Sequence, residues 1–203
     1  MLVLIQTFHT PRRFTVAKRL QLTVNLGMAT SEDKSQPFHL EEITVSSSLA
    51  IIAEARELLL EYGCFVIAQP GCERFCYGSL EKEAAGLPLS FNQQGGGCLL
   101  AYVLGKPAGF VAWRTLTASI ATIAWELKRL WVRPSGRGLG LGRALTQAVI
   151  DRASAQGCKA VFLDTVPASM DAAYRLYLQM GFEPCTPYND NPVEELAYLV
   201  KRL

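Results

Sequence analysis

The feature that most limits how this chain can fold is a glycine-rich segment, residues 136–142 (GRGLGLG). It follows the alternating pattern of a β-strand at 120–132 and precedes an amphipathic pattern that predicts a helix at 139–156. Glycine permits positive φ angles and lets a ligand approach the backbone closely. The unpaired N–H groups at the start of a helix favour an anion, and Arg137 and Arg143 add positive charge. The segment therefore predicts a phosphate-binding turn.

The spacing of the glycines excludes two common phosphate-binding motifs. The P-loop pattern G-x-x-x-x-G-K-[ST] is absent, because Leu141 stands five places after Gly136 and Arg143 follows Gly142. The dinucleotide pattern G-x-G-x-x-G also fails, whether it is started at Gly136 or at Gly138. A glycine-rich turn without any ligand is the alternative on these observations alone.

Two longer patterns narrow the choice of phosphate-binding motif. Residues 137–142 (RGLGLG) fit Q/R-x-x-G-x-G/A, and residues 173–182 (AYRLYLQMGF) fit A-x-x-x-Y-x-x-x-G-F. Residues 130–134 (LWVRP) supply a strand end and a turn before the first pattern. In these motifs the chain resembles the GNAT acetyltransferases, in a branch of small proteins of mostly unassigned substrate. The resemblance follows the element order over residues 40–203 and is sharpest over 126–182.

The order of the remaining patterns is consistent with an α/β protein. Strands are expected at 41–45, 98–104, 108–116, 120–132, 159–165, 182–185 and 194–203, and helices at 49–62, 79–85, 139–156 and 169–180. Gly63 is expected to end the first helix. Antiparallel strands followed by β-α-β-α-β indicate a mixed central sheet with helices on both faces. The resemblance implies the GNAT (acyl-CoA N-acyltransferase) fold, in which two parallel strands splay apart.

Alternation within the strand at 120–132 assigns its side chains to two faces. One face is expected to carry Trp125, Leu127 and Arg129, and the other Glu126, Lys128 and Leu130.

Charge divides the chain into two parts. Residues 1–31 contain four basic residues and no acid, and the remainder carries 16 basic and 18 acidic residues, a net charge of −2. We therefore expect residues 1–37 to be a basic, disordered N-terminal extension and residues 38–203 to form the acetyltransferase domain. An organelle transit segment over residues 1–27 and an upstream start before Met28 are both consistent with this composition. The expected location is cytoplasmic, with organelle import if the segment is a transit peptide.

Composition excludes several chemistries. The chain has two histidines, His9 and His39, which argues against Ser-His-Asp or Cys-His catalysis and against a histidine-rich metal site, so no metal is expected. The six cysteines are expected to be reduced thiols. A net charge of +2 gives no strong field for nucleic acid, and the lack of an 18-residue apolar run predicts no membrane span.

The resemblance implies that the co-substrate is acetyl-CoA. Its pantetheine arm is expected between the splayed strands, where the backbone of Leu130, Trp131 and Val132 pairs with it. Its pyrophosphate is expected on the N–H groups at the helix N-terminus. The residues concerned are Arg137, Gly138, Leu139, Gly140, Leu141, Gly142 and Arg143.

The resemblance also implies two catalytic side chains. Glu126 matches a glutamate that often acts as general base on the attacking amine, and Tyr177 matches the tyrosine that supplies a proton or hydrogen bond to the departing thiolate. The alternative for Glu126 is a simple ion pair with Lys128. The alternative for Tyr177 is a core position, since Tyr174 shares its helix side. No cysteine is placed for an acyl-enzyme, so direct attack in a ternary complex is expected.

The acceptor is left open by the sequence. The resemblance implies that residues 64–97 and 188–192 shape its pocket, and Glu73, Arg74, Phe75 and Tyr77 either line it or pack a small helix. A small-molecule amine, an amino acid or a peptide N-terminus all remain candidates, as do a longer acyl donor and a monomer or homodimer. The rival interpretation is a non-catalytic acyl-CoA-binding sensor on the same fold.

Overall fold

The computed structural model describes residues 37–72, 79–93, 95–116, 123–193 and 195–203. Residues 1–36 of the predicted N-terminal extension, which include the transit segment and Met28, lie outside these residues. Within them, no helix is long and apolar enough to cross a membrane.

A seven-stranded sheet forms the centre of the molecule, in the order β1-β2-β3-β4-β5-β7-β6. Neighbouring strands are antiparallel except β4 and β5, which run parallel. The strands are β1 (Phe38–Glu42), β2 (Gly97–Val103), β3 (Lys106–Leu116), β4 (Ala124–Val132), β5 (Ala160–Thr165), β6 (Glu183–Pro184) and β7 (Ala197–Arg202).

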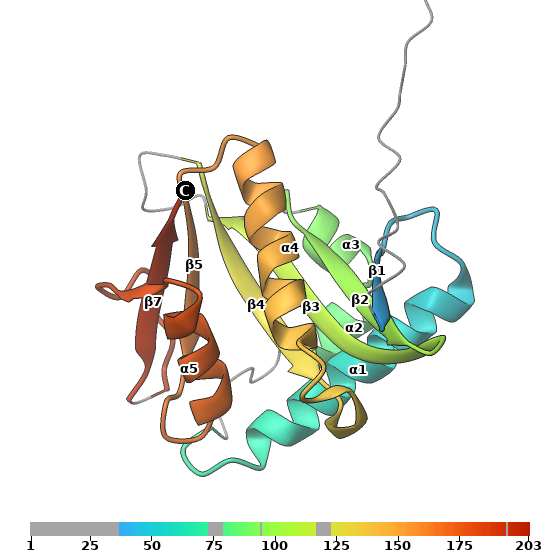
Figure 1. The fold of residues 1–203 in the computed structure, drawn as a ribbon, viewed down its shortest axis with the longest axis horizontal. Coiled ribbons are helices and arrows are strands. Elements are labelled where there is room, and N and C mark those ends of the chain that lie inside the picture. The colour runs from blue at the N-terminus through green and yellow to red at the C-terminus, as the bar shows by residue number, and fades with distance from the viewer. Residues whose placement is uncertain (1–36, 73–78, 94, 117–122, 194) are drawn as a thin grey trace, which may run out of the picture. The chain divides into compact units, whose positions relative to one another are not determined.

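Helices cover both faces of this sheet (Figure 1). One face carries α1 (Leu49–Ile67), α2 (Leu80–Ala85) and α3 (Leu89–Asn92), and the other carries α4 (Leu141–Ala155) and α5 (Asp171–Gln179). Alternation along β2 supplies both cores, because Cys98 and Leu100 pack toward α1 whereas Leu99 packs toward α4. The predicted mixed sheet with helices on both faces is confirmed.

Helix α1 begins at a capped N-terminus and runs past its predicted end. The Ser48 hydroxyl accepts a hydrogen bond from the Ile51 N–H at 3.3 Å. The helix continues through Gly63 to Ile67, so the predicted end at Gly63 is wrong. A Cβ on Gly63 would lie 1.8 Å from Cδ2 of Leu80. This glycine therefore allows α2 to pack closely on α1 instead of ending the helix.

The parallel pair is joined along only a short stretch. Residues Ala124–Glu126 of β4 pair with Ala160–Phe162 of β5, while β4 continues to Val132 and β5 to Thr165. Beyond Glu126 the two strands diverge, and the gap between them opens toward the start of α4 (Figure 1). The predicted splayed pair of parallel strands is confirmed.

A β-bulge in β4 overturns the predicted assignment of faces. Ala112 of β3 lies opposite Lys128 and Phe110 lies opposite Trp131, so two residues of β4 face Val111. One of them, Arg129, has a φ of 59°. After this bulge the faces are exchanged. Arg129 therefore lies on the α1 face, with its guanidinium 5.8 Å from the Tyr62 ring centroid, and Leu130 packs toward α4.

Candidate active site

The glycine-rich segment joins β4 to α4 through a short 3₁₀ turn, Pro134–Gly136. Gly138 and Gly140 have φ angles of 78° and 79°, in the left-handed region that side chains disfavour. A Cβ on either of them would meet no atom of the described residues within 4 Å. These two glycines are therefore required by backbone conformation, and the space in front of them is open to a ligand.

The N-terminus of α4 has unused hydrogen-bond donors. Its first helical bond runs from the Ala144 N–H to the Gly140 carbonyl at 3.0 Å, and no side chain from the described part of the chain caps the end. The N–H groups of Leu141, Gly142 and Arg143 consequently lack partners within the helix. They lie at the positive end of the helix dipole, so this end can hold an anion.

Two exposed arginines flank that end of the helix. Arg137 donates from Nε to the Val132 carbonyl at 3.2 Å, and its guanidinium lies 5.5 Å from the centroid of the Trp131 ring. Arg143 donates from Nη2 to Oε1 of Gln179 at 3.4 Å. Leu139, between them in sequence, is exposed, whereas Leu141, the first residue of α4, is buried. The predicted anion-binding residues thus occupy one continuous turn.

The end of β4 is fixed from the α1 side. Trp131 is buried against Phe65, with 5.0 Å between ring centroids, and its Nε1 donates to Glu61 at 3.2 Å. Arg133 also donates to Glu61, and this hydrogen bond is the main reason that the pKa of Glu61 is lowered. Leu130 and Val132 point to the opposite face. Their backbone lies along the part of β4 that β5 does not pair with.

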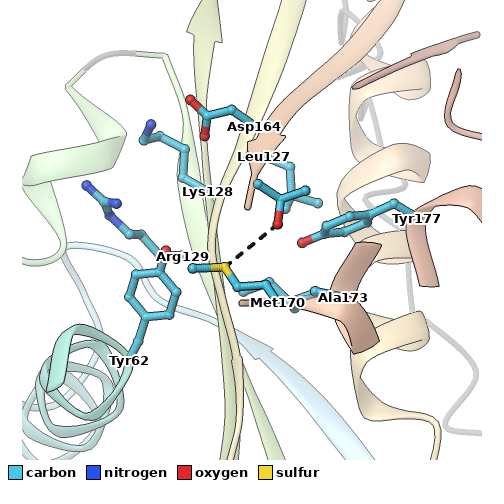
Figure 2. Close-up of a pocket in the computed structure, with 10 residues that line it drawn as sticks. Tyr62, Leu127, Lys128, Arg129, Asp164, Met170, Ala173 and Tyr177 are labelled. Carbon is cyan, nitrogen blue, oxygen red and sulfur yellow. Dashed lines mark hydrogen bonds between the residues drawn. The ribbon is translucent and has the colours of Figure 1, made fainter. Parts of the chain in front are cut away.

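A pocket of about 40 Å³ opens between the diverging strands (Figure 2). It is lined by Tyr62, Leu127, Lys128, Arg129, Leu130, Asp164, Thr165, Met170, Ala173 and Tyr177. The lining therefore comes from α1, β4, β5, α5 and the turn before α5.

Tyr177 presents its hydroxyl to this pocket, as Figure 2 shows. The side chain is 5% exposed, and its hydroxyl has no hydrogen-bond partner among the described residues. Burial, together with the negative charge of Asp164, raises the pKa of Tyr177 above its ordinary value, so the phenol stays protonated. Tyr174 does not line the pocket. Tyr177 is thus placed to donate a hydrogen bond to a bound molecule.

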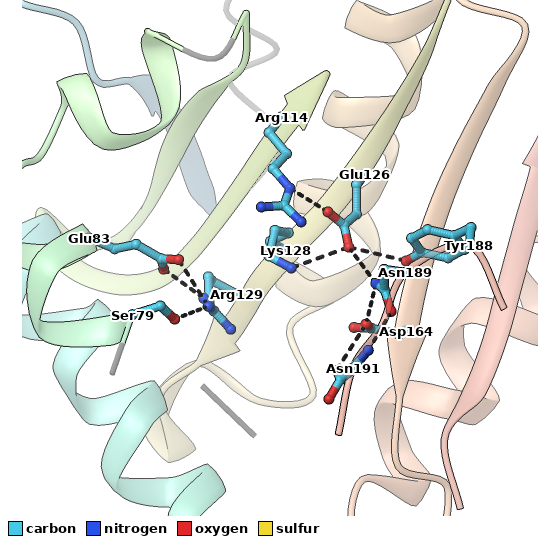
Figure 3. Close-up of polar contacts among 10 residues, drawn as sticks. All are labelled: Ser79, Glu83, Arg114, Glu126, Lys128, Arg129, Asp164, Tyr188, Asn189 and Asn191. Carbon is cyan, nitrogen blue, oxygen red and sulfur yellow. Dashed lines mark hydrogen bonds and ion pairs between the residues drawn. The ribbon is translucent and has the colours of Figure 1, made fainter. Parts of the chain in front are cut away.

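Glu126 lies in a dense polar network beside the pocket (Figure 3). Its side chain is completely buried, and it accepts from Nε of Arg114 at 2.5 Å and from Nζ of Lys128 at 3.2 Å. The Tyr188 hydroxyl and Nδ2 of Asn189 each donate to it at 3.3 Å. The ion pair with Lys128 that sequence analysis weighed is present, and Arg114 was missed. Glu126 is not among the residues that line the pocket.

Asp164 was also missed, and it connects the network to β5. Its Oδ2 accepts from Nδ2 of Asn189 at 2.9 Å and from Nδ2 of Asn191 at 3.1 Å. The segment 188–191 therefore bridges β4 and β5 where they separate (Figure 3). A sequence signal existed for Asp164, because ligands in open α/β sheets bind at the carboxyl ends of parallel strands.

Part of the predicted acceptor region lies outside the described residues, namely Glu73, Arg74, Phe75 and Tyr77. Among the residues that are described, no group of three or more His, Cys, Asp or Glu side chains is arranged to hold a metal ion.

Comparison with known proteins finds one matching family model. It is described as the acetyltransferase (GNAT) family, and it matches residues 58–182, more than half of the chain. An uncharacterized N-acetyltransferase of Escherichia coli is 27% identical over 166 residues, which cover 79% of this chain and 94% of that protein. Another, of Schizosaccharomyces pombe, is 39% identical over 74 residues, covering 36% of this chain and 45% of that protein. This second match spans less than half of its relative.

Solved structures share the fold at low sequence identity. A GNAT-family acetyltransferase of Staphylococcus aureus superposes with a TM-score of 0.62 at 17% identity, covering 81% of this chain and 98% of that one. An acetyltransferase of Salmonella typhimurium, solved with acetyl-CoA, has a TM-score of 0.61 at 16% identity, covering 82% of this chain and 94% of that one.

Proposed function

Since the chain belongs to the acetyltransferase (GNAT) family and is an N-acyltransferase of the GNAT type, we propose that it moves an acetyl group from acetyl-CoA to a primary amine. The transfer proceeds by direct attack in a ternary complex. The acceptor is a small amine, an amino acid or a peptide N-terminus. A longer acyl-CoA is the alternative donor on the same scaffold.

The donor site is supported by the turn between β4 and α4. The uncapped helix N-terminus, the open space at Gly138 and Gly140, and the charges of Arg137 and Arg143 suit a pyrophosphate. The part of β4 at Leu130–Val132, with which β5 does not pair, leads from this turn into the gap, where the pantetheine arm lies. A related fold from Salmonella typhimurium was solved with acetyl-CoA. Most of these contacts are made by main-chain atoms.

The observation that carries the proposal is the Tyr177 hydroxyl, which faces the pocket without a partner among the described residues. When the amine nitrogen attacks the acetyl carbon, a C–N bond forms, the C–S bond breaks and the sulfur leaves as a thiolate. The surplus proton on the new amide nitrogen passes to that thiolate or to solvent. Tyr177 donates a hydrogen bond to that sulfur. Its raised pKa keeps the donor hydrogen in place, so the phenol stabilises the developing charge without ionising.

The general base is proposed to be Glu126. An alkyl amine has a pKa of ~10.4, so it arrives protonated and must lose a proton before it attacks. A carboxylate beside the pocket can take that proton directly or through water. Among the described residues, the contacts from Lys128, Tyr188 and Asn189 all end on Oε1 of Glu126. Oε2 receives only Arg114 from the described part of the chain, so it can still accept a proton.

Calorimetric titration of the full chain with acetyl-CoA, ATP and NAD tests the donor assignment. We expect binding of acetyl-CoA alone, followed by thiol release when amines are added. Binding without turnover across a broad amine panel would favour the sensor interpretation. Binding of ATP or NAD in place of acetyl-CoA would contradict the donor assignment.

A further inference from the structure

The charges that line the pocket are unequally compensated. Lys128 pairs with Glu126 at 3.2 Å, and Arg129 pairs with Glu83 at 2.8 Å. Asp164 is the acidic side chain of the lining, and within the described part of the chain no cationic group lies within ion-pairing distance of it. Each cation of the lining therefore has a carboxylate partner, whereas Asp164 has no cationic partner among the described residues.

Asp164 is nevertheless firmly oriented. Both described hydrogen bonds to it, from Asn189 at 2.9 Å and from Asn191 at 3.1 Å, end on Oδ2. Neutral amides fix the direction of the carboxylate without cancelling its charge, and Oδ1 is left for another donor. The charge reaches the pocket, because Asp164 contributes to the raised pKa of Tyr177.

We propose that Asp164 binds the ammonium group of the acceptor, which makes it the residue that selects a cationic amine for this site. The inference rests on the proposed function and adds a substrate-binding residue to it. An ammonium at Oδ1 forms a charge-assisted hydrogen bond in a partly buried site. It also sits in the same small pocket as the Tyr177 hydroxyl, the proposed hydrogen-bond donor to the thioester sulfur.

Glu126 does not satisfy the same requirements. Its two oxygens already receive two cations, a phenol and an amide, and the residue does not line the pocket. A second ammonium there would add a third positive charge to one carboxylate. The two acids therefore have different roles. Asp164 lines the pocket and binds the amine, whereas Glu126 lies outside the lining and remains the proposed general base.

The test compares a charged and an uncharged nucleophile. Propylamine is protonated at mildly alkaline pH, whereas hydroxylamine is neutral there and still attacks thioesters. The variant is Asp164→Asn, which keeps an oxygen acceptor for Asn189 and Asn191. The matched control is Asp151→Asn, which removes an exposed carboxylate on α4 outside the pocket. Propylamine is followed as a substrate by thiol release or as a competitor of hydroxylamine, and acetyl-CoA affinity is measured by calorimetry.

We expect Asp164→Asn to weaken propylammonium by roughly ten- to a hundredfold, the usual worth of a hydrogen bond to a charged group. The loss in turnover of hydroxylamine should be at least about tenfold smaller than the loss for propylammonium. Affinity for acetyl-CoA should change little, and Asp151→Asn should behave as the wild type. Equal losses for both nucleophiles, or no loss for propylammonium, would overturn the assignment.

A second measurement needs no variant. In the wild-type protein, propylammonium should compete with hydroxylamine at least about tenfold more strongly than its uncharged isostere propanol. Equal competition by the two, or none by either, would overturn the role of Asp164 while acetyl-CoA still binds. Failure of the wild type to bind acetyl-CoA at all would instead remove the proposed function and the inference with it.

Discussion

At the scale of single residues, the assignment of Tyr177 depends on one hydroxyl. Tyr177→Phe removes that group and keeps the ring, which packs against Phe182 with 5.7 Å between centroids. We expect kcat to fall by roughly a hundredfold, the order of effect of a positioned acid or base. Affinity for acetyl-CoA, measured by calorimetry, should change little.

Tyr174→Phe is the control for this change, since Tyr174 lies one turn earlier on α5 and does not line the pocket. Equal losses in the two variants would assign both tyrosines to packing.

The pH profile of kcat gives a further check on Tyr177. Burial raises the pKa of Tyr177, so the hydrogen-bond donor persists beyond the ordinary phenol pKa of ~10, and kcat should show no alkaline decline from this group below that pH.

At the scale of elements, the turn before α4 can be compared with the turn after it. Gly140 and Gly157 have nearly the same φ, 79° and 76°, and a Cβ on either would lie in open space. Glutamate at each position should cost about the same in unfolding free energy, roughly 1–2 kcal/mol for the left-handed backbone. Only Gly140→Glu adds a negative charge at the proposed pyrophosphate site. We therefore expect it alone to abolish acetyl-CoA binding.

Calorimetry and urea unfolding of the two variants separate strain from recognition. Equal loss of acetyl-CoA binding in Gly140→Glu and Gly157→Glu would mean that a general loosening of α4 explains the effect. Retained micromolar binding by Gly140→Glu would remove the pyrophosphate from this turn.

The helices and strands also show what apolar periodicity can predict and what it cannot. The helix at 49–67 and the strand at 124–132 were predicted in type, because apolar spacing determines type. The bulge at Arg129 was not predicted. A bulge is an extra residue in one strand relative to its partner strand, so the sequence of one strand alone does not show it. Gly63 was taken as a stop signal, although its role is close packing against Leu80. Both errors concern contacts between segments that are distant in sequence.

At the scale of the whole molecule, the fold followed from two motifs whose order and separation are specific. The candidate site was only partly predictable for a physical reason. Tyr188 and Asn189 contact Glu126 across 62 and 63 residues, and Asn191 contacts Asp164 across 27. Such partners have no fixed spacing in the sequence. The main-chain site at residues 137–143 is local by comparison, so its spacing was informative.

The same network places Glu126 at the position where two parts of the sheet are connected. Among the described residues, strand pairing joins β1–β4 to β5–β7 at three positions of β4 and β5, and Glu126 is one of them. Glu126→Gln would leave Arg114 and Lys128 facing a neutral amide. We expect this to lower the unfolding free energy by about 3 kcal/mol, as when one partner of a buried pair is removed. Urea unfolding measures the loss.

Glu183→Gln is the matched control, because Glu183 pairs with Arg202 at 3.2 Å on the surface, with side chains 70% and 76% exposed. Its loss should stay below about 1 kcal/mol. Activity then distinguishes the two roles of Glu126. If it is the general base, Glu126→Gln lowers kcat by roughly a hundredfold or more in protein that is still folded. A stability loss with unchanged kcat would show that Glu126 has a structural role only. The general base would then be another group in the pocket.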